Sequence, residues 1–144
     1  MAQVEVHQGH PYPRYFVHWK TGQGELVEPF SFSTPIISEG AVTEFIELLP
    51  GGFLLLRKGY VWDFGSGAWD TPDIVYASLA HDAFYELMEL GLLSKSYRKR
   101  VDRYFRRTLK DSNTRTFRRT YLYIAVRLFY PIARRFRMWR KSDE

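Results

Sequence analysis

Apolar residues in the first sixty positions recur in short runs that glycine and proline interrupt. The four clearest runs span residues 15–19, 26–32, 44–49 and 53–56. Short β-rich runs divided by turn residues are typical of antiparallel strands. The turn Pro50-Gly51-Gly52, between the last two runs, supplies the backbone angles of a hairpin. The sequence therefore predicts a mainly β segment over residues 1–62.

Beyond residue 70 the apolar period lengthens to about 3.6 residues, which is typical of helices. Thr71-Pro72-Asp73 combines a capping side chain, a preset φ and an acid near the helix start. Gly91 is a typical helix stop. A second helix is predicted from Ser94 or Ser96 to Lys110, and a third begins near Asn113 and should kink or break at Pro131.

Strands followed by about three helices predict an α+β fold in which helices pack on or beside an antiparallel sheet. Residues 1–62 are mainly β and residues 71–140 mainly α, with the first two helices forming an antiparallel pair. The 144 residues are enough for one hydrophobic core, so we expect a single domain over residues 1–144.

Composition removes several kinds of chemistry. The chain has no cysteine, which excludes disulfides, thiolate zinc sites and a cysteine nucleophile, and fits a reducing compartment. Aromatic residues reach 17%, and because such rings normally supply core and interface area, they indicate packing or an interface. No signal peptide and no transmembrane helix are expected from the apolar pattern.

Charge is distributed unevenly along the chain. Residues 1–92 carry four Lys or Arg against twelve Asp or Glu, whereas residues 93–144 carry 17 against four. Either the two halves neutralise each other or the basic half binds an anionic partner: nucleic acid, anionic lipid or an acidic protein surface. The residues expected to face such a partner are Arg98, Arg103, Arg106, Arg107, Arg118, Arg119, Arg134 and Arg135.

The candidate chemistry lies on the first predicted helix. At 100° per residue, one inward stripe contains Ile74, Ala77, Ser78, His81, Tyr85 and Met88. An imidazole inside such a stripe needs a partner for its nitrogens, and a carboxylate is the natural one. Asp102 on the next helix can face His81 if the two helices are antiparallel, while Asp82 lies at the edge of the stripe.

Several separated motifs resemble domain-of-unknown-function family 1353, whose members occur in phages and prophages. These motifs are a Gly59–Ser66 loop, His81-Asp82-x-x-Tyr85, an Asp102-Arg103 helix and a final segment around Arg127. Val101 stands where the family usually has Ala. The likeness covers roughly half the chain and implies a phage-type protein, located in the host cytoplasm or in the virion. Its partners would then be a phage virion or a host protein.

A second likeness is to phospholipase A2 enzymes, which also carry His-Asp-x-x-Tyr opposite an aspartate. That resemblance implies His81 as general base, Asp102 with Tyr85 as its orienting support, and Asp82 as a Ca²⁺ ligand. A loop from Asp63 would complete the calcium site. Such a centre would make the chain a metal-assisted hydrolase. The absent cysteines and the sparse glycine of this loop depart from that family.

The same residues fit a non-enzymatic interpretation. A histidine bonded to an acid from a neighbouring helix often forms a buried polar network that fixes packing. Asp63 is equally explained as a turn residue, and a run of arginines as a solvated helix face. The protein would then be a virion component, or a factor that binds a host protein, nucleic acid or an anionic membrane.

Overall fold

The computed structural model of the chain describes residues 13–63, 72–111, 123 and 127. The chain divides into two compact units, Met1–Trp62 and Asp63–Glu144. Within the described residues, every strand belongs to the first unit and every helix to the second. The α+β class predicted from the sequence is therefore confirmed, and the change from strands to helices falls after residue 62 as expected.

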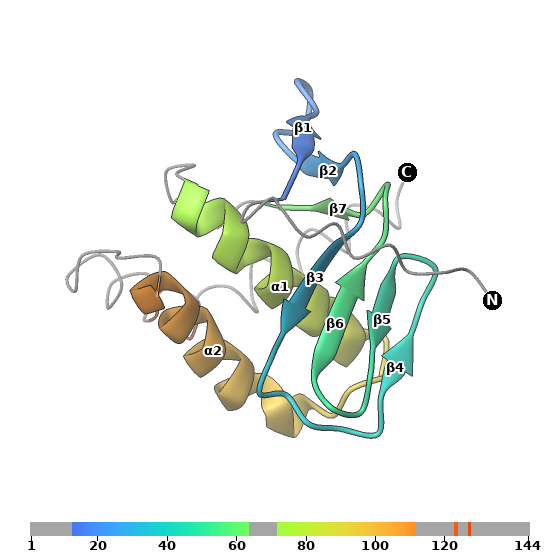
Figure 1. Ribbon diagram of the computed structural model, residues 1–144, viewed down its shortest axis with the longest axis vertical. Coiled ribbons are helices and arrows are strands. Elements are labelled where there is room, and N and C mark those ends of the chain that lie inside the picture. Colours follow the sequence, from blue (N-terminus) through green and yellow to red (C-terminus); the bar gives the residue numbers. More distant parts are fainter. Residues whose placement is uncertain (1–12, 64–71, 112–122, 124–126, 128–144) are drawn as a thin grey trace. The chain divides into compact units, whose positions relative to one another are not determined.

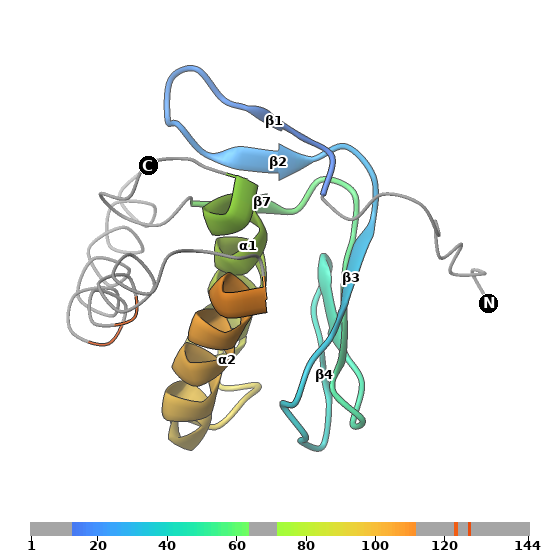
Figure 2. The same cartoon turned by 60° about the vertical axis from the view of Figure 1, so that its left-hand side comes forward.

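The described residues of the first unit, 13–62, form two antiparallel sheets (Figure 1). Their strands are β1 Tyr15–Val17, β2 Gly24–Leu26, β3 Phe30–Ser33, β4 Ala41–Val42, β5 Ile46–Leu48, β6 Phe53–Leu56 and β7 Val61–Trp62. One sheet has the order β1-β2-β7 and the other β3-β6-β5-β4. Figure 2 shows β1 and β2 running crosswise to β3. The single run predicted over 26–32 is thus two strands in different sheets, separated at Pro29, which has no N–H for a ladder.

The hairpin of β5 and β6 supplies much of the apolar interior of this unit. Ile46 pairs with Leu56 and Leu48 with Leu54 across the ladder. All four side chains are almost fully buried. Since alternate residues of a strand face the same side, one face of the predicted hairpin points into the core.

Gly52 closes that hairpin at a point where another backbone comes very close. Its φ is +91°, and its carbonyl accepts hydrogen bonds from both the amide and the hydroxyl of Thr34, at 2.9 and 2.7 Å. A Cβ on Gly52 would lie 2.1 Å from the Thr34 carbonyl oxygen. The neighbouring Gly51 has no such restriction, because a Cβ there would meet nothing within 4 Å.

In the second unit, helix α1 spans Pro72–Glu89 and ends just before Gly91, the residue predicted to stop it. Gly91 has φ +74°, its amide bonds the Met88 carbonyl, and the Leu92 amide bonds the Leu87 carbonyl. This is the Schellman pattern, which satisfies the last free carbonyls of a helix. The predicted start and stop of the first helix are both confirmed.

Helix α2 follows a short 3₁₀ helix. Ser94 caps η1 (Lys95–Tyr97), and α2 spans Arg98–Asp111. Figures 1 and 2 show α1 and α2 side by side, and their contacts run in opposite directions, since His81 meets Asp102 while the later Tyr85 meets the earlier Arg98. The expected antiparallel pair is therefore present.

The third predicted helix, from about Asn113, lies outside the described residues apart from Tyr123 and Arg127, whose backbones are helical. The described part of the chain thus holds two α-helices and one 3₁₀ helix instead of about three helices. In that part, no helix combines the length and the apolar character that crossing a membrane requires.

Substituting Gly52 should be far more damaging than substituting Gly51. We expect Gly52→Ala to lower the free energy of unfolding by at least about 2 kcal/mol, because it adds a strained positive φ to a backbone clash. Gly51→Ala, one residue away in the same turn, is the matched control and should change it by less than about 0.5 kcal/mol. Urea denaturation of both variants measures the difference; equal losses would contradict the close approach at Gly52.

Candidate functional site

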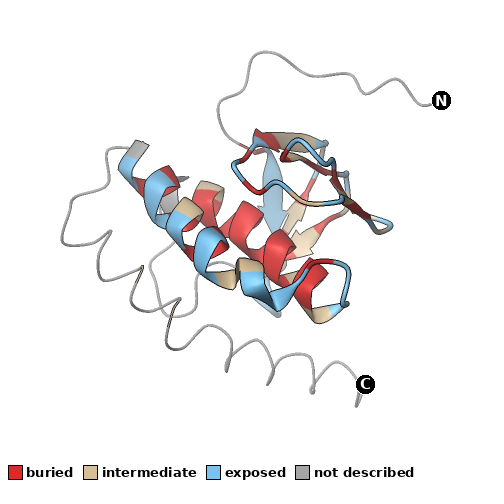
Figure 3. Ribbon diagram, turned by 90° about the horizontal axis from the view of Figure 1, so that it is seen from below, coloured by how far each residue is buried: buried red, intermediate tan, exposed pale blue. Residues whose placement is uncertain are grey.

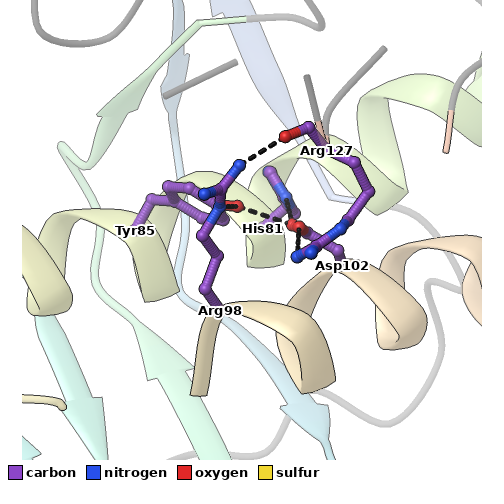
Figure 4. A network of polar contacts seen from close by, with 5 residues as sticks. All are labelled: His81, Tyr85, Arg98, Asp102 and Arg127. Carbon is purple, nitrogen blue, oxygen red and sulfur yellow. Dashed lines mark hydrogen bonds and ion pairs between the residues drawn. The ribbon is translucent and has the colours of Figure 1, made fainter. Parts of the chain in front are cut away.

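The antiparallel pairing of α1 and α2 brings together the residues that the sequence singled out. His81 and Tyr85 lie one turn apart on α1, and Arg98 and Asp102 lie one turn apart on α2, so each pair occupies one helix face. Figure 4 shows these four side chains converging with Arg127. The predicted approach of Asp102 to His81 is confirmed.

The Asp102 carboxylate is the centre of the cluster and is completely buried. Its Oδ1 lies 2.7 Å from Nε2 of His81 and accepts a hydrogen bond from the Tyr85 hydroxyl, also at 2.7 Å. Its Oδ2 accepts a hydrogen bond from Nη1 of Arg127 at 3.0 Å. Because a carboxylate paired with arginine is an acceptor, Nε2 is the imidazole nitrogen that carries the hydrogen toward it.

Arg98 forms a second layer around the carboxylate. Its Nε donates to the Tyr85 hydroxyl at 3.3 Å, and its Nη2 donates to the Arg127 backbone carbonyl. Arg98 therefore links α2 both to α1 and to the residue that pairs with Asp102 (Figure 4). The sequence placed Arg98 among the residues facing an anionic partner, whereas here it is half-buried in the network.

Tyr85 is held in its neutral form. Burial, followed by the negative charge of Asp102 and the hydrogen bond to it, raises the pKa of Tyr85 well above its usual range, although Arg98 acts in the opposite direction. The phenol thus keeps its proton and donates it to Oδ1. Tyr85 supports the carboxylate as a hydrogen-bond donor and adds no charge of its own.

Aromatic rings fix the orientation of the His81 imidazole. The Tyr85 ring centroid lies 4.4 Å from that of His81, and the Phe105 centroid lies 5.1 Å away. Only 2% of His81 is exposed to solvent. A positive charge formed on this ring would therefore be stabilised mainly by Asp102 and little by bulk water.

Both proposed calcium ligands, Asp82 and Asp63, lie in the described part of the chain. Asp82 is buried on α1 directly after His81, and Asp63 precedes residues 64–71, which lie outside the described part. Among the described residues, no group of three or more His, Cys, Asp or Glu side chains is placed to hold a metal ion. The predicted Asp63–Gly67 loop therefore remains a prediction.

The basic residues expected on a partner surface fall into three groups. Arg103, Arg106 and Arg107 are exposed on α2, and Arg98 belongs to the buried network. The remaining four, Arg118, Arg119, Arg134 and Arg135, lie outside the described residues.

Arg127 was not predicted as part of the site. Its position in the sequence could have indicated this role, because Arg127 is the one charged residue in the apolar run from Tyr121 to Ala133. A cation among apolar residues usually pairs with a buried acid. Arg98 also had a signal, because it precedes Asp102 by four residues and so shares its helix face.

Comparison with protein-family models, with curated proteins and with solved structures finds no match for this chain. The resemblances to family 1353 and to phospholipase A2 therefore remain predictions that rest on motifs. What the site can do follows from its own atoms, distances and burial.

The raised pKa of Tyr85 predicts how stability depends on pH. Tyr85→Phe removes a hydrogen bond to a charged group and should cost about 2 kcal/mol at pH 8. Above pH 10 the unfolded chain releases the Tyr85 proton while the folded chain retains it, so rising pH favours unfolding through Tyr85 in the wild type, and Tyr85→Phe lacks this contribution.

The stability gap between wild type and Tyr85→Phe should consequently narrow from pH 9 to pH 11, by at most about 1.4 kcal/mol per pH unit. Urea denaturation of both proteins at pH 8, 9, 10 and 11 measures it. A gap that stays constant over this range would contradict the raised pKa.

Proposed function

We propose that the chain is a hydrolase in which His81 is the general base and Asp102 positions it. The observation that carries this proposal is the 2.7 Å contact between Nε2 of His81 and Oδ1 of a carboxylate with no exposed surface. Such a contact selects one tautomer of the imidazole, orients the ring and stabilises the imidazolium that forms when the base takes a proton. The proton-accepting atom is then the other ring nitrogen, Nδ1.

The reaction we propose is hydrolysis of an ester, the class implied by the phospholipase A2 resemblance. Nδ1 of His81 takes a proton from water while the water oxygen bonds to the ester carbonyl carbon. The tetrahedral intermediate then breaks its bond to the alcohol oxygen, which receives the proton back from Nδ1. Asp102 stays ionised throughout and balances the transient charge on His81.

Three other side chains support this role by fixing Asp102. Tyr85 and Arg127 donate to its two oxygens, and Arg98 holds both of these residues from α2. A carboxylate with this many donors has one orientation, so the imidazole bonded to it has one orientation as well. We assign Tyr85, Arg98 and Arg127 as positioning residues.

A second candidate function has one observation in its favour, which is the 2% exposure of His81. A ring so enclosed fits a polar network that fixes the packing of α1 on α2 in a protein without enzymatic activity. The motifs shared with family 1353 support a phage protein for either candidate, located in the host cytoplasm or the virion. In the second case it would be a virion component or would bind a host protein.

Replacing His81 tests the proposed base. We expect His81→Gln to lower the rate of ester hydrolysis by about 100- to 10,000-fold, because general-base catalysis contributes that much. The probes are 4-nitrophenyl butyrate, followed by absorbance, and phosphatidylglycerol mixed micelles, followed by titration of released acid.

The matched control is His18→Gln, which removes the other described histidine paired with a carboxylate, Glu25 at 3.3 Å. His18 is partly exposed and should be dispensable for hydrolysis. Two results together would overturn the enzymatic proposal and show that the network serves packing. The wild type would hydrolyse neither probe faster than His81→Gln does, and His81→Gln would unfold at a markedly lower temperature than the wild type.

Calcium binding by Asp82 and Asp63 is a separate part of the proposal. If these carboxylates hold Ca²⁺, 5 mM CaCl₂ should raise the melting temperature of the wild type and should not raise that of Asp82→Asn. Equimolar MgCl₂ controls for ionic strength. No calcium-specific shift in the wild type would rule out the calcium site while leaving the roles of His81 and Asp102 open to the hydrolysis assay.

A further inference from the structure

The outward side of α2 is uniformly cationic. Over residues 98–110, the exposed residues are Lys99, Arg100, Arg103, Arg106, Arg107 and Lys110. Each exposed residue of this stretch is thus a lysine or an arginine; Figure 3 colours the exposed residues pale blue. With 1.5 Å of rise per residue, the six charges extend over about 16 Å of helix.

These charges are not neutralised by acids in the described part of the chain. None of the six takes part in an ion pair among residues 13–63, 72–111, 123 and 127. Arg100 lies over the Tyr97 ring at 4.9 Å and Arg106 over the Tyr123 ring at 5.5 Å, which orients both guanidinium groups without cancelling their charge. Of the two acids on α2, Asp102 points inward and is fully buried, and Asp111 is the last residue of the helix, directly after Lys110.

The distribution of apolar residues on α2 limits what kind of partner this face fits. Val101, Phe105 and Leu109 are buried, so α2 has no free apolar face to insert into a lipid interface. Protein interfaces depend on buried aromatic or aliphatic anchors, which the exposed residues of α2 lack. A partner recognised by charge alone, with anionic groups repeated along a line, fits best.

We propose that the exposed face of α2 binds the sugar–phosphate backbone of a nucleic acid. Four of the six cations are arginines, whose planar guanidinium groups match phosphate oxygens in a bidentate manner. A duplex presents about one negative charge per 1.7 Å of its axis, so a 16 Å stripe faces several phosphates at once. Contacts of this kind are independent of base sequence. The proposal stands whether or not His81 catalyses hydrolysis.

A DNA-binding assay tests this proposal. Binding of the full chain to a fluorescein-labelled 20-base-pair DNA is measured by fluorescence anisotropy from 50 to 300 mM NaCl. The variant is Arg103→Gln with Arg107→Gln, two exposed residues one turn apart that Gln replaces without loss of helix propensity. At 100 mM NaCl we expect its affinity to fall about tenfold or more. The slope of log association constant against log NaCl concentration is negative, and in the variant it should be shallower by about 1.8, or roughly 0.9 for each lost phosphate contact.

The control is Lys20→Gln with Lys58→Gln, which removes the same charge from exposed positions of the other unit. It should change affinity less than twofold. Equal losses of affinity in the two double variants would show that binding depends only on net charge, which would overturn the proposal. Absence of DNA binding by the wild type would also overturn it.

Single-stranded DNA and duplex RNA of the same length distinguish which nucleic acid is preferred. Vesicles of phosphatidylglycerol and phosphatidylcholine provide the competing class of partner. The proposal would be contradicted if the wild type bound these vesicles more tightly than every nucleic acid and the Arg103→Gln, Arg107→Gln variant lost that binding. The partner of α2 would then be a membrane surface.

Discussion

A carboxylate removed from water costs several kcal/mol unless its charge is paired and its oxygens are hydrogen-bonded. Asp102 meets both conditions with three donors from two parts of the chain: His81 and Tyr85 on α1, and Arg127 beyond α2. The pairing of α1 with α2 depends on this requirement, because sliding one helix along the other would leave a buried charge unpaired. Packing of Val101, Phe105 and Leu109 adds stability but tolerates such slippage more readily.

The surroundings of that carboxylate give the cluster its rigidity. From Val75 to Met88 nearly every α1 side chain is buried, Asp82 included, so α1 is withdrawn from solvent on most of its circumference. Alanines at 77, 80 and 83 keep the helix slender enough for close packing. Side chains on two such helices are placed more precisely than side chains on loops, and any chemistry at His81 would benefit from this. The same enclosure equally suits a network that only fixes packing.

The features predicted from the sequence were mostly local. The Pro50-Gly51-Gly52 hairpin and the Gly91 stop follow from turn chemistry, which acts within a few residues. The approach of Asp102 to His81, across 21 positions, followed from helical spacing together with the expected antiparallel pairing of two consecutive helices. The division of 26–32 into two sheets was signalled by Pro29 but not predicted. Arg127 reaches Asp102 across 25 positions, and no periodicity specifies such a contact. Whether the cluster reacts or only packs depends on access to Nδ1, which spacing does not encode.

Helix α2 turns Asp102 inward and six of its lysines and arginines outward, and this arrangement constrains which mutations the helix tolerates. Each inserted or deleted residue rotates the remainder of a helix by about 100°. A single insertion between Arg98 and Asp102 would turn the carboxylate out of the cluster and carry cations toward the interior. Evolution can therefore substitute the outward lysines and arginines one at a time without disturbing the buried cluster. Insertions or deletions within α2 would disrupt that cluster. Divergent relatives should vary in length outside α2.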